Sequence, residues 1–207
     1  MNDVVAQSSL TLTPFTAADY PQLIDWIDSD ELNYLWGGPN YQFPLTVAQI
    51  EAHCAQPQVH PFLFHVQGVA SGFIELYQVD NQNVRLCRIF IAHAQRGKGL
   101  ASPMIELAIG VATEQLNAGL LSLAVFEHNA VACHCYQQLG FVETPWEQGT
   151  RSSNAHRWHQ GTRSFNGHRW NLVRMEKTLP LQGSHHGHHT AEITPQGETH
   201  ASRDTDV

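Results

Sequence analysis

The chain has 207 residues, of which 42% are hydrophobic, which is enough for one domain with a substantial core. Its 11 Lys and Arg against 19 Asp and Glu give a formal net charge of −8, which argues against a nucleic-acid binder that depends on basic side chains. No window approaches the ~18 apolar residues of a membrane span, and the first residues do not resemble a signal peptide. We therefore expect a cytoplasmic protein without nucleic-acid or membrane partners.

The first 50 residues are predicted to form one strand and two helices, each helix starting at a capping pattern. Leu10 to Phe15 alternates and contains threonine, which predicts a strand. Thr16 to Asp19 and Thr46 to Gln49 each have the pattern of a capping box, and each predicts the start of a helix. Trp36 to Pro39, which lies between these two helices, is predicted to be a loop.

The middle of the chain predicts an antiparallel meander followed by a long helix. Three strand-like runs (62–67, 69–79 and 84–92) are separated by short turns. The helix has an apolar stripe that begins at Leu100, and Gly119 follows its end. Later elements are predicted as a strand at 120–126, a helix at 130–139, and strands at 141–144 and 172–178.

A tandem duplication lies between the last two predicted strands. Residues 148–159 (QGTRSSNAHRWH) and 160–171 (QGTRSFNGHRWN) are identical at nine of twelve positions. A solenoid needs more and longer repeats. We therefore predict that the segment 148–171 extends a surface loop or hairpin, with a gained contact surface as the alternative.

The cysteines and the histidine-rich tail predict no required metal. Cys54, Cys87, Cys133 and Cys135 form neither paired metal knuckles nor a dense disulfide framework. The sulfurs of Cys133 and Cys135 would point to different faces of a helix. Residues 180–207 are predicted to be disordered, so that His185 to His189 would bind metal only adventitiously. The folded domain is predicted to span residues 1–179.

A glycine-containing turn precedes the long helix. Gly97 and Gly99 let the main chain bend sharply and leave amide N–H groups unobstructed, with a helix N-terminus behind them. Arg96 and Lys98 would add positive charge, and Ser102 a hydroxyl. The spacing differs from both the P-loop and the dinucleotide-binding pattern. The turn therefore predicts a pyrophosphate site, with a purely structural tight turn as the alternative.

Two sequence blocks resemble the GNAT superfamily of N-acetyltransferases. Arg96, Gly99 and Ala101 fill the superfamily pattern of the turn, and the second block runs from Asn129-Ala130 through Tyr136 to Leu139-Gly140-Phe141. The order of elements agrees from about residue 10 to 179. The resemblance implies an α/β (α+β) fold with a mixed, mostly antiparallel sheet of six to seven strands, about four flanking helices, and two central parallel strands that splay apart.

The resemblance also implies acetyl-CoA as co-substrate. The turn would hold its pyrophosphate, the preceding strand would run along the pantetheine arm and bind the thioester carbonyl, and Asn129 would contact the arm from the next strand. The cofactor-binding residues implied in this way are Ile89, Phe90, Ile91, Arg96, Gly97, Lys98, Gly99, Leu100, Ala101, Ser102 and Asn129.

The catalytic residues implied by the resemblance begin with Tyr136. Its phenol would protonate the departing thiolate while an amine attacks, although the residue is also compatible with a core aromatic. Glu75 is our first candidate for the general base and is equally compatible with an exposed strand carboxylate; Glu127 and His93 are weaker candidates. Some superfamily members carry Glu where Ala124 stands, so that version of the mechanism is in doubt for this chain.

Trp36 and Tyr41 are the candidate acceptor-binding residues. They lie between the first two predicted helices, and the resemblance implies that this segment lines the acceptor pocket. Either could pack against an aliphatic chain or a cation, or simply close the core. The function predicted first is acetyl transfer to a small primary amine by a monomer or homodimer. The alternatives are acetylation of a protein N-terminus or lysine, as in the ribosomal-protein branch, and a non-catalytic module that binds coenzyme A or metal.

Overall fold

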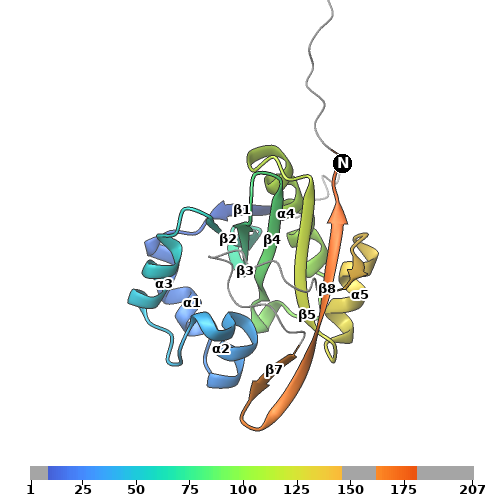
Figure 1. Ribbon diagram of the computed structural model, residues 1–207. Coiled ribbons are helices and arrows are strands. Elements are labelled where there is room, and N and C mark those ends of the chain that lie inside the picture. Colours follow the sequence, from blue (N-terminus) through green and yellow to red (C-terminus); the bar gives the residue numbers. More distant parts are fainter. Residues whose placement is uncertain (1–8, 146–161, 181–207) are drawn as a thin grey trace, which may run out of the picture.

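The computed structural model describes residues 9–145 and 162–180 (Figure 1). The first copy of the duplication and the histidine-rich tail, for which the sequence predicts a surface segment and disorder, lie outside the described residues. So do the first eight residues, on which the signal-peptide prediction rests.

A mixed sheet forms the centre of the molecule in the order β1-β2-β3-β4-β5-β8-β6, and β7 pairs with β8 off this path. All neighbouring strands are antiparallel except β4 and β5, which confirms the predicted fold class. The strands are β1 (Leu10–Pro14), β2 (Val59–Val66), β3 (Val69–Gln78), β4 (Asn83–Ile91), β5 (Leu120–Phe126), β6 (Val142–Thr144), β7 (Thr162–Phe165) and β8 (His168–Thr178).

The parallel strands β4 and β5 splay apart, as predicted. They pair only where Asn83–Arg85 lies beside Leu120–Ser122, and the two ribbons diverge beyond this point (Figure 1). A bulge in β4 places Arg88 and Ile89 opposite the single residue Ile74 of β3. Arg88 has a φ of 51°, and such a bulge bends a strand and increases its twist. The bend accompanies the opening between the two strands.

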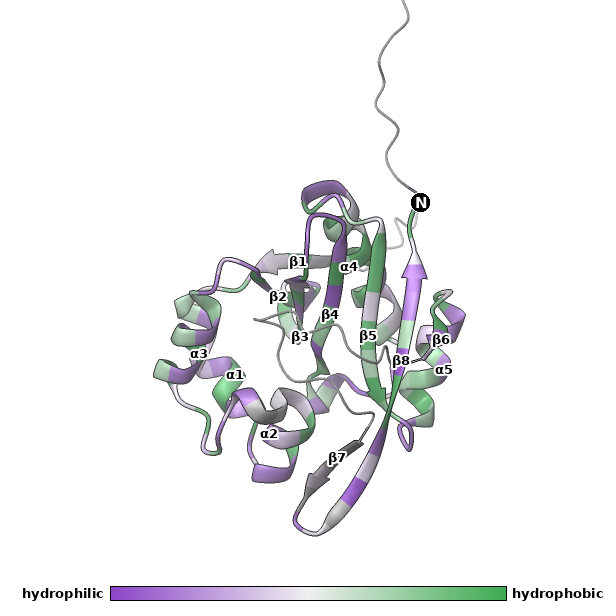
Figure 2. Ribbon diagram, in the orientation of Figure 1, coloured by the Kyte–Doolittle hydropathy of each residue, from purple (hydrophilic) through white to green (hydrophobic). Residues whose placement is uncertain are grey.

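Two hydrophobic cores cover the opposite faces of the sheet. One core contains Ile74 and Leu86 and packs against α4 and α5; the other contains Phe73 and Phe90 and packs against α1, α2 and α3. Side chains of successive strand residues alternate between faces, which is why Phe73 and Ile74 belong to different cores. The corresponding helices lie on either side of the sheet (Figures 1 and 2).

The helices begin largely where the capping residues predict. Thr46 Oγ1 accepts a hydrogen bond from the N–H of Gln49, and the N–H of Thr16 donates to Asp19 Oδ2 at 2.8 Å. The helices are α1 (Tyr20–Trp26), α2 (Asp30–Gly37), α3 (Val47–Cys54), α4 (Ala101–Gln115) and α5 (Ala130–Gln138), with 3₁₀ turns at Ala17–Asp19, Gly38–Asn40 and His93–Gln95.

The prediction of a loop at 36–39 is wrong for its first half, because Trp36 lies in the last turn of α2. Ser29 caps this helix by accepting a hydrogen bond from the N–H of Leu32, and Asp30 and Glu31 add negative charge to the first turn. These residues were a usable signal for a helix. The two glycines after Trp36 indicate where the helix ends but not where it begins.

The second copy of the duplication does not form an open loop. Residues 162–165 and 168–171 pair as a hairpin, closed by Asn166 and Gly167 with φ values of 47° and 78°. Two consecutive positive φ angles are typical of a type I′ turn, which matches the twist of the flanking strands and favours Asn-Gly. The first copy carries Asn154-Ala155 at the matching positions of the sequence. The two copies are therefore not interchangeable at the turn.

Gly167→Ala should loosen this hairpin. No atom lies within 4 Å of a Cβ built at Gly167, so the cost comes from the left-handed backbone alone, about 1 kcal/mol in free energy of unfolding. Urea denaturation measures the loss. Asn166→Gly is the control, because glycine tolerates the φ of that position; equal stability of Gly167→Ala and the wild type would contradict the role given to the turn.

Candidate functional site

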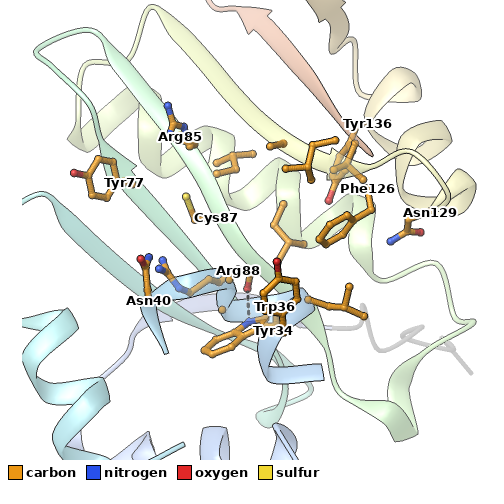
Figure 3. Close-up of a pocket in the computed structure, with 18 residues that line it drawn as sticks. Tyr34, Trp36, Asn40, Tyr77, Arg85, Cys87, Arg88, Phe126, Asn129 and Tyr136 are labelled. Carbon is orange, nitrogen blue, oxygen red and sulfur yellow. Dashed lines mark hydrogen bonds between the residues drawn. The ribbon is translucent and has the colours of Figure 1, made fainter. Parts of the chain in front are cut away.

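A pocket of about 140 Å³ opens where β4 and β5 diverge (Figure 3). Its walls come from α2 and the following 3₁₀ turn, from the middle of β4, from the end of β5, from the N-cap and the last turn of α5, and from single residues of β3 and β8. The lining residues are Tyr34, Leu35, Trp36, Gly37, Gly38, Asn40, Tyr77, Arg85, Leu86, Cys87, Arg88, Ile89, Ala124, Val125, Phe126, Asn129, Tyr136 and Leu172. The structure thus brings together four residues predicted for the site: Tyr136, Asn129, Ile89 and Trp36.

Tyr136 reaches the pocket from α5. The side chain is 7% exposed, and its ring packs edge-on against Phe141 at 6.2 Å between centroids. Burial raises the pKa of Tyr136 well above its ordinary value, and the nearby Cys135 and Cys133 add to the shift. The phenol is therefore protonated at neutral pH, as a proton donor must be.

The glycine-containing turn leads directly into α4. Residues 96–99 are exposed, Gly97 and Gly99 have φ values of 75° and 72°, and α4 starts directly after them. The first turn of a helix leaves N–H groups without intrahelical acceptors. The Ser102 hydroxyl and the Cys135 thiol lie within hydrogen-bond distance, 3.3 Å apart, and so connect the start of α4 to the residue before Tyr136. An anion held by the turn would lie on the same side of the sheet as Tyr136.

The basic side chains of the turn are held close to the protein. Arg96 Nε donates to the carbonyl oxygen of Ile91 at 3.1 Å, and its guanidinium lies over the Phe90 ring. Lys98 Nζ donates to Gln95 Oε1 at 2.8 Å. Because both basic side chains are engaged in this way, the main-chain amides of the turn are the better suited groups for an anion. The side chain of Phe90 packs in the core beside α1, so only its main chain is available to the gap.

Trp36 and Tyr41 lie one behind the other. Trp36 lines the pocket, and its Nε1 donates to the carbonyl oxygen of Arg88 at 2.9 Å. Tyr41 stacks on Trp36 at 5.4 Å and is 5% exposed, and it is not part of the pocket lining. Of these two predicted acceptor-binding residues, the structure brings only Trp36 to the pocket.

Glu75 lies behind the pocket in a buried ion-pair network. Its carboxylate accepts a hydrogen bond from Arg88 Nη1 and another from His53 Nε2 at 2.8 Å, and its side chain is 1% exposed. Burial alone would raise the pKa of Glu75, but the charge of Arg88 and the hydrogen bond from His53 outweigh it, so the pKa lies below its ordinary value. Direct proton removal would require this carboxylate to leave both partners. Its role as base stays a prediction.

The two weaker candidates for the general base also lie outside the pocket. Glu127 and His93 are exposed, and neither belongs to the pocket lining. Glu127 accepts a hydrogen bond from Asn171 Nδ2 at 2.9 Å, which ties the end of β5 to β8. Ala124 lines the pocket and carries no group that could take a proton.

The hairpin of the second repeat packs against two residues that line the pocket, Tyr34 and Phe126, but none of its own described residues lines it. The Tyr34 hydroxyl of α2 donates to the carbonyl oxygen of Ser164 at 2.9 Å. Trp170 lies 6.2 Å from the Tyr34 ring and 5.8 Å from the Phe126 ring, and both of these aromatics line the pocket. This favours the alternative interpretation of the duplicated segment, a gained contact surface, for the copy that the structure describes.

Sequence reasoning missed Arg85, Arg88 and Asn40, which all line the pocket. The two arginines of the otherwise apolar strand β4 could have indicated a functional site, because charged side chains are rarely buried in a sheet unless they are paired. Nothing in the sequence indicated the bulge that turns Arg88 toward the gap. Asn40 belongs to a 3₁₀ turn, the start of which was predicted as part of the loop.

The described residues contain no cluster of three or more His, Cys, Asp or Glu side chains that could hold a metal ion. Cys133 and Cys135 point to different partners, the carbonyl of Phe126 and the hydroxyl of Ser102. Within the same part of the chain, none of the helices has the length and apolar character needed to cross a membrane.

Two curated relatives of this chain are acetyltransferases by name. The chain is 30% identical over 92 residues to the spermidine N(1)-acetyltransferase of Escherichia coli (strain K12), which covers 44% of this chain and 50% of that protein. It is 34% identical over 94 residues to the streptothricin acetyltransferase of Streptomyces lavendulae, covering 43% and 49%. The chain thus spans about half the length of these curated relatives.

Solved structures show the same fold at low identity. The spermidine N-acetyltransferase from Vibrio cholerae, in complex with CoA and spermine, superposes with a TM-score of 0.66 at 22% identity, over 82% of this chain and 95% of that one. A putative phosphinothricin N-acetyltransferase gives a TM-score of 0.64 at 19% identity, over 83% and 99%.

The sequence also matches the Acetyltransferase (GNAT) family over residues 21–141, which is more than half of the chain. This stretch contains both sequence blocks, the splayed strands and Tyr136. The chain belongs to the GNAT family of acetyltransferases.

Proposed function

We propose that this protein transfers the acetyl group of acetyl-CoA to the primary amine of a small acceptor, directly and in a ternary complex. The amine nitrogen attacks the thioester carbonyl carbon, the C–N bond forms, and the C–S bond breaks. The thiolate takes the phenolic proton of Tyr136. The acceptor ammonium loses one proton to water or to a base before the neutral amine attacks, and the nitrogen loses a second proton as the amide forms, which restores the Tyr136 phenol through water. No covalent enzyme intermediate is needed, and the cysteines have no catalytic role.

The observation that carries this proposal is the pocket between the diverging strands, with Tyr136 on one of its walls. Main-chain groups of β4 beside Ile89 have no pairing with β5 where that strand has diverged, so they are suited to bind the thioester carbonyl. The turn at 96–101 would hold the pyrophosphate on the α4–α5 side, and Asn129 would contact the pantetheine arm. The acceptor would enter from the α1–α3 side.

A small acceptor fits this site better than a protein chain. The pocket is about 140 Å³, and the hairpin packs behind its lining residue Tyr34 through Ser164 and Trp170. The named relatives acetylate small amines according to their names, namely spermidine and streptothricin. We propose that this protein also acetylates a small amine. We further propose that it is a cytoplasmic enzyme that works as a monomer or homodimer.

The test is an acceptor screen that follows release of free thiol from acetyl-CoA. The screen should include amino acids, amino sugars, polyamines, aminoglycosides and short peptides, and calorimetry should measure binding of coenzyme A separately. We expect coenzyme A to bind and at least one small amine to be acetylated. Absence of coenzyme A binding would refute the proposal, and turnover of peptides alone would transfer the activity to protein acceptors.

Gly99→Ala should weaken coenzyme A binding selectively. Alanine at a φ of 72° strains the turn by about 1–2 kcal/mol and adds a methyl group where the diphosphate would approach, so we expect about a 10-fold higher Kd. Gly110→Ala is the matched control: Gly110 lies inside α4, no atom is within 4 Å of a Cβ built there, and its coenzyme A affinity should not change. An equal loss in both variants would contradict a diphosphate site at the turn.

A further inference from the structure

The charge of the pocket is opposite to what a polycation would need. The chain contains 19 Asp and Glu, yet none of the 18 described residues that line the pocket is acidic. Two of them, Arg85 and Arg88, are basic. Glu75 is the acid behind this wall, and its carboxylate is bound by Arg88 and His53. An ammonium group of the acceptor that reached this wall would meet arginine and no free carboxylate.

Hydrogen-bond donors without partners lie at the same wall. Among the described residues, neither Arg88 Nε nor Asn40 Nδ2 has a hydrogen-bond partner, and both residues line the pocket. The Arg88 side chain is 5% exposed and is fixed by Glu75 and by the Tyr41 ring, 5.3 Å from its guanidinium carbon. A guanidinium has five N–H groups in a rigid arrangement that suits carboxylate oxygens. Arg88 is therefore held in a fixed position, and its Nε–H remains available to donate a hydrogen bond to a ligand.

These groups lie on the acceptor side of the sheet. Arg85 pairs with Tyr77 across β3 and β4, and their neighbours Val84 and Leu86 belong to the core on the α4–α5 face. By strand alternation, Arg85 and Tyr77 face α1–α3. Figure 3 shows Arg85, Cys87, Arg88 and Asn40 at one end of the pocket and Tyr136 with Phe126 and Asn129 at the other. An acceptor in the pocket would thus extend from Tyr136 toward the arginines.

We propose that the acceptor is a small amine that also carries a carboxylate, such as an amino acid, with its amine toward Tyr136 and its carboxylate toward Arg88, Arg85 and Asn40. The inference rests on the proposed acetyl transfer and narrows its substrate class. It departs from the polyamines in the names of several relatives, and the reason is local. Polyamines are polycations, whereas this pocket is lined by no acidic residue of the described chain and by two arginines, Arg85 and the Glu75-paired Arg88.

The Trp36 ring does not reverse this conclusion. A polyamine could use cation–π contacts in place of carboxylates. Trp36 is 8% exposed, its ring is stacked on Tyr41 at an interplanar angle of 16°, and its N–H is used by the Arg88 carbonyl. Most of its surface is thus already covered by protein.

The test compares each amino acid with its own carboxamide and with spermidine, by thiol release at saturating acetyl-CoA. We expect the best amino acid to exceed its carboxamide and spermidine in kcat/KM by about 10-fold or more, because a site built for a hydrogen-bonding group rejects the analogue that lacks it. 2-Aminoethylphosphonate distinguishes a carboxylate site from a general oxyanion site, and a phosphonate preferred over every amino acid would overturn the carboxylate assignment. Spermidine or a carboxamide as the best acceptor would also overturn it.

Arg85→Gln provides the second arm, because Arg85 is outside the buried ion pair and its loss should not prevent folding. We expect its KM for the amino acid to rise about 10-fold, with KM for the carboxamide and for acetyl-CoA unchanged, and Arg85→Lys should recover part of the loss. Equal effects on amino acid and carboxamide would overturn the assignment. If coenzyme A does not bind by calorimetry, or if no amine in the screen is acetylated, the proposed acetyl transfer itself fails; if coenzyme A binds and spermidine or another amine without a carboxylate is the best acceptor, only the carboxylate assignment fails.

Discussion

Replacing Tyr136 by phenylalanine should lower kcat by about 100-fold or more while leaving coenzyme A affinity unchanged. General acid catalysis contributes about 10²–10⁴-fold, and the variant removes the proton donor but keeps the ring that packs against Phe141. Thiol release under saturating conditions measures kcat, and calorimetry measures the affinity. Because burial raises the pKa of Tyr136 above its ordinary value of about 10, wild-type kcat should not decline below that pH through loss of this proton.

Tyr77→Phe is the matched control for this variant. Tyr77 also lines the pocket, at the end away from Tyr136, and loses the same hydroxyl. We expect its kcat to change by less than about threefold, since its hydroxyl does not reach the thioester in the proposed arrangement. Undiminished turnover by Tyr136→Phe would show that another group protonates the thiolate.

Glu75→Gln should be the most destabilising of the variants considered, by about 3–5 kcal/mol in free energy of unfolding. Glutamine keeps the size of the side chain and removes its charge, which leaves the Arg88 guanidinium buried without its counter-ion. Urea denaturation measures the loss. Glu176→Gln is the control, because its ion pair with Arg174 is partly exposed, at 20% and 23%, and should contribute less than about 1 kcal/mol.

The pH dependence of this loss has a definite sign. The pKa of Glu75 is lowered in the folded state, because Arg88 and His53 outweigh the effect of burial. Its ionised form therefore stabilises the fold fully above the unfolded pKa of about 4.3, and the stabilisation is lost as the pH falls through the folded value. The difference between wild type and Glu75→Gln should be complete at pH 7 and shrink below about pH 4. A difference that grew on acidification would contradict the ion-pair account.

The same variant separates a positioning role from a base. If Glu75 positions Arg88, we expect KM for the acceptor to rise more than kcat falls, at a temperature where the variant is folded. The double variant Glu75→Gln, Arg88→Met should recover stability, because it removes the unpaired charge. If instead turnover drops by about 100-fold or more and the acidic limb of the pH profile disappears, the result would support the base that the sequence suggested.

Local signals in the sequence were enough for most of the fold. The capping residues Thr16 and Thr46, the alternation along the meander and the glycines at 97 and 99 each act over a few residues, so their consequences could be predicted one element at a time. Helix α2 was missed although Ser29 and its acidic first turn were visible. The sequence left a surface loop and a hairpin open for residues 148–171, and the structure shows a hairpin for residues 162–171.

Some of the residues predicted for the site line the pocket and others do not, and the difference has a physical cause. Tyr136 and Asn129 lie on a helix and at its cap, where sequence blocks fix their place, and the structure brings both to the pocket. Glu75 and Tyr41 were chosen by position in the chain, but which face of a strand or which layer a side chain occupies depends on partners far away in sequence. Both lie one layer behind the lining.

The sequence by itself determined the family, the phosphate-binding turn as a candidate and the candidate acid, because these depend on residues that are close together along the chain. Only the tertiary structure decided the character of the acceptor pocket. The bulge at Arg88 lies in the pairing of β4 with β3, the pocket opens where β4 and β5 stop pairing, and α2 contacts the hairpin through Tyr34 and Ser164. Each of these is a contact between distant segments, which no local pattern of residues specifies.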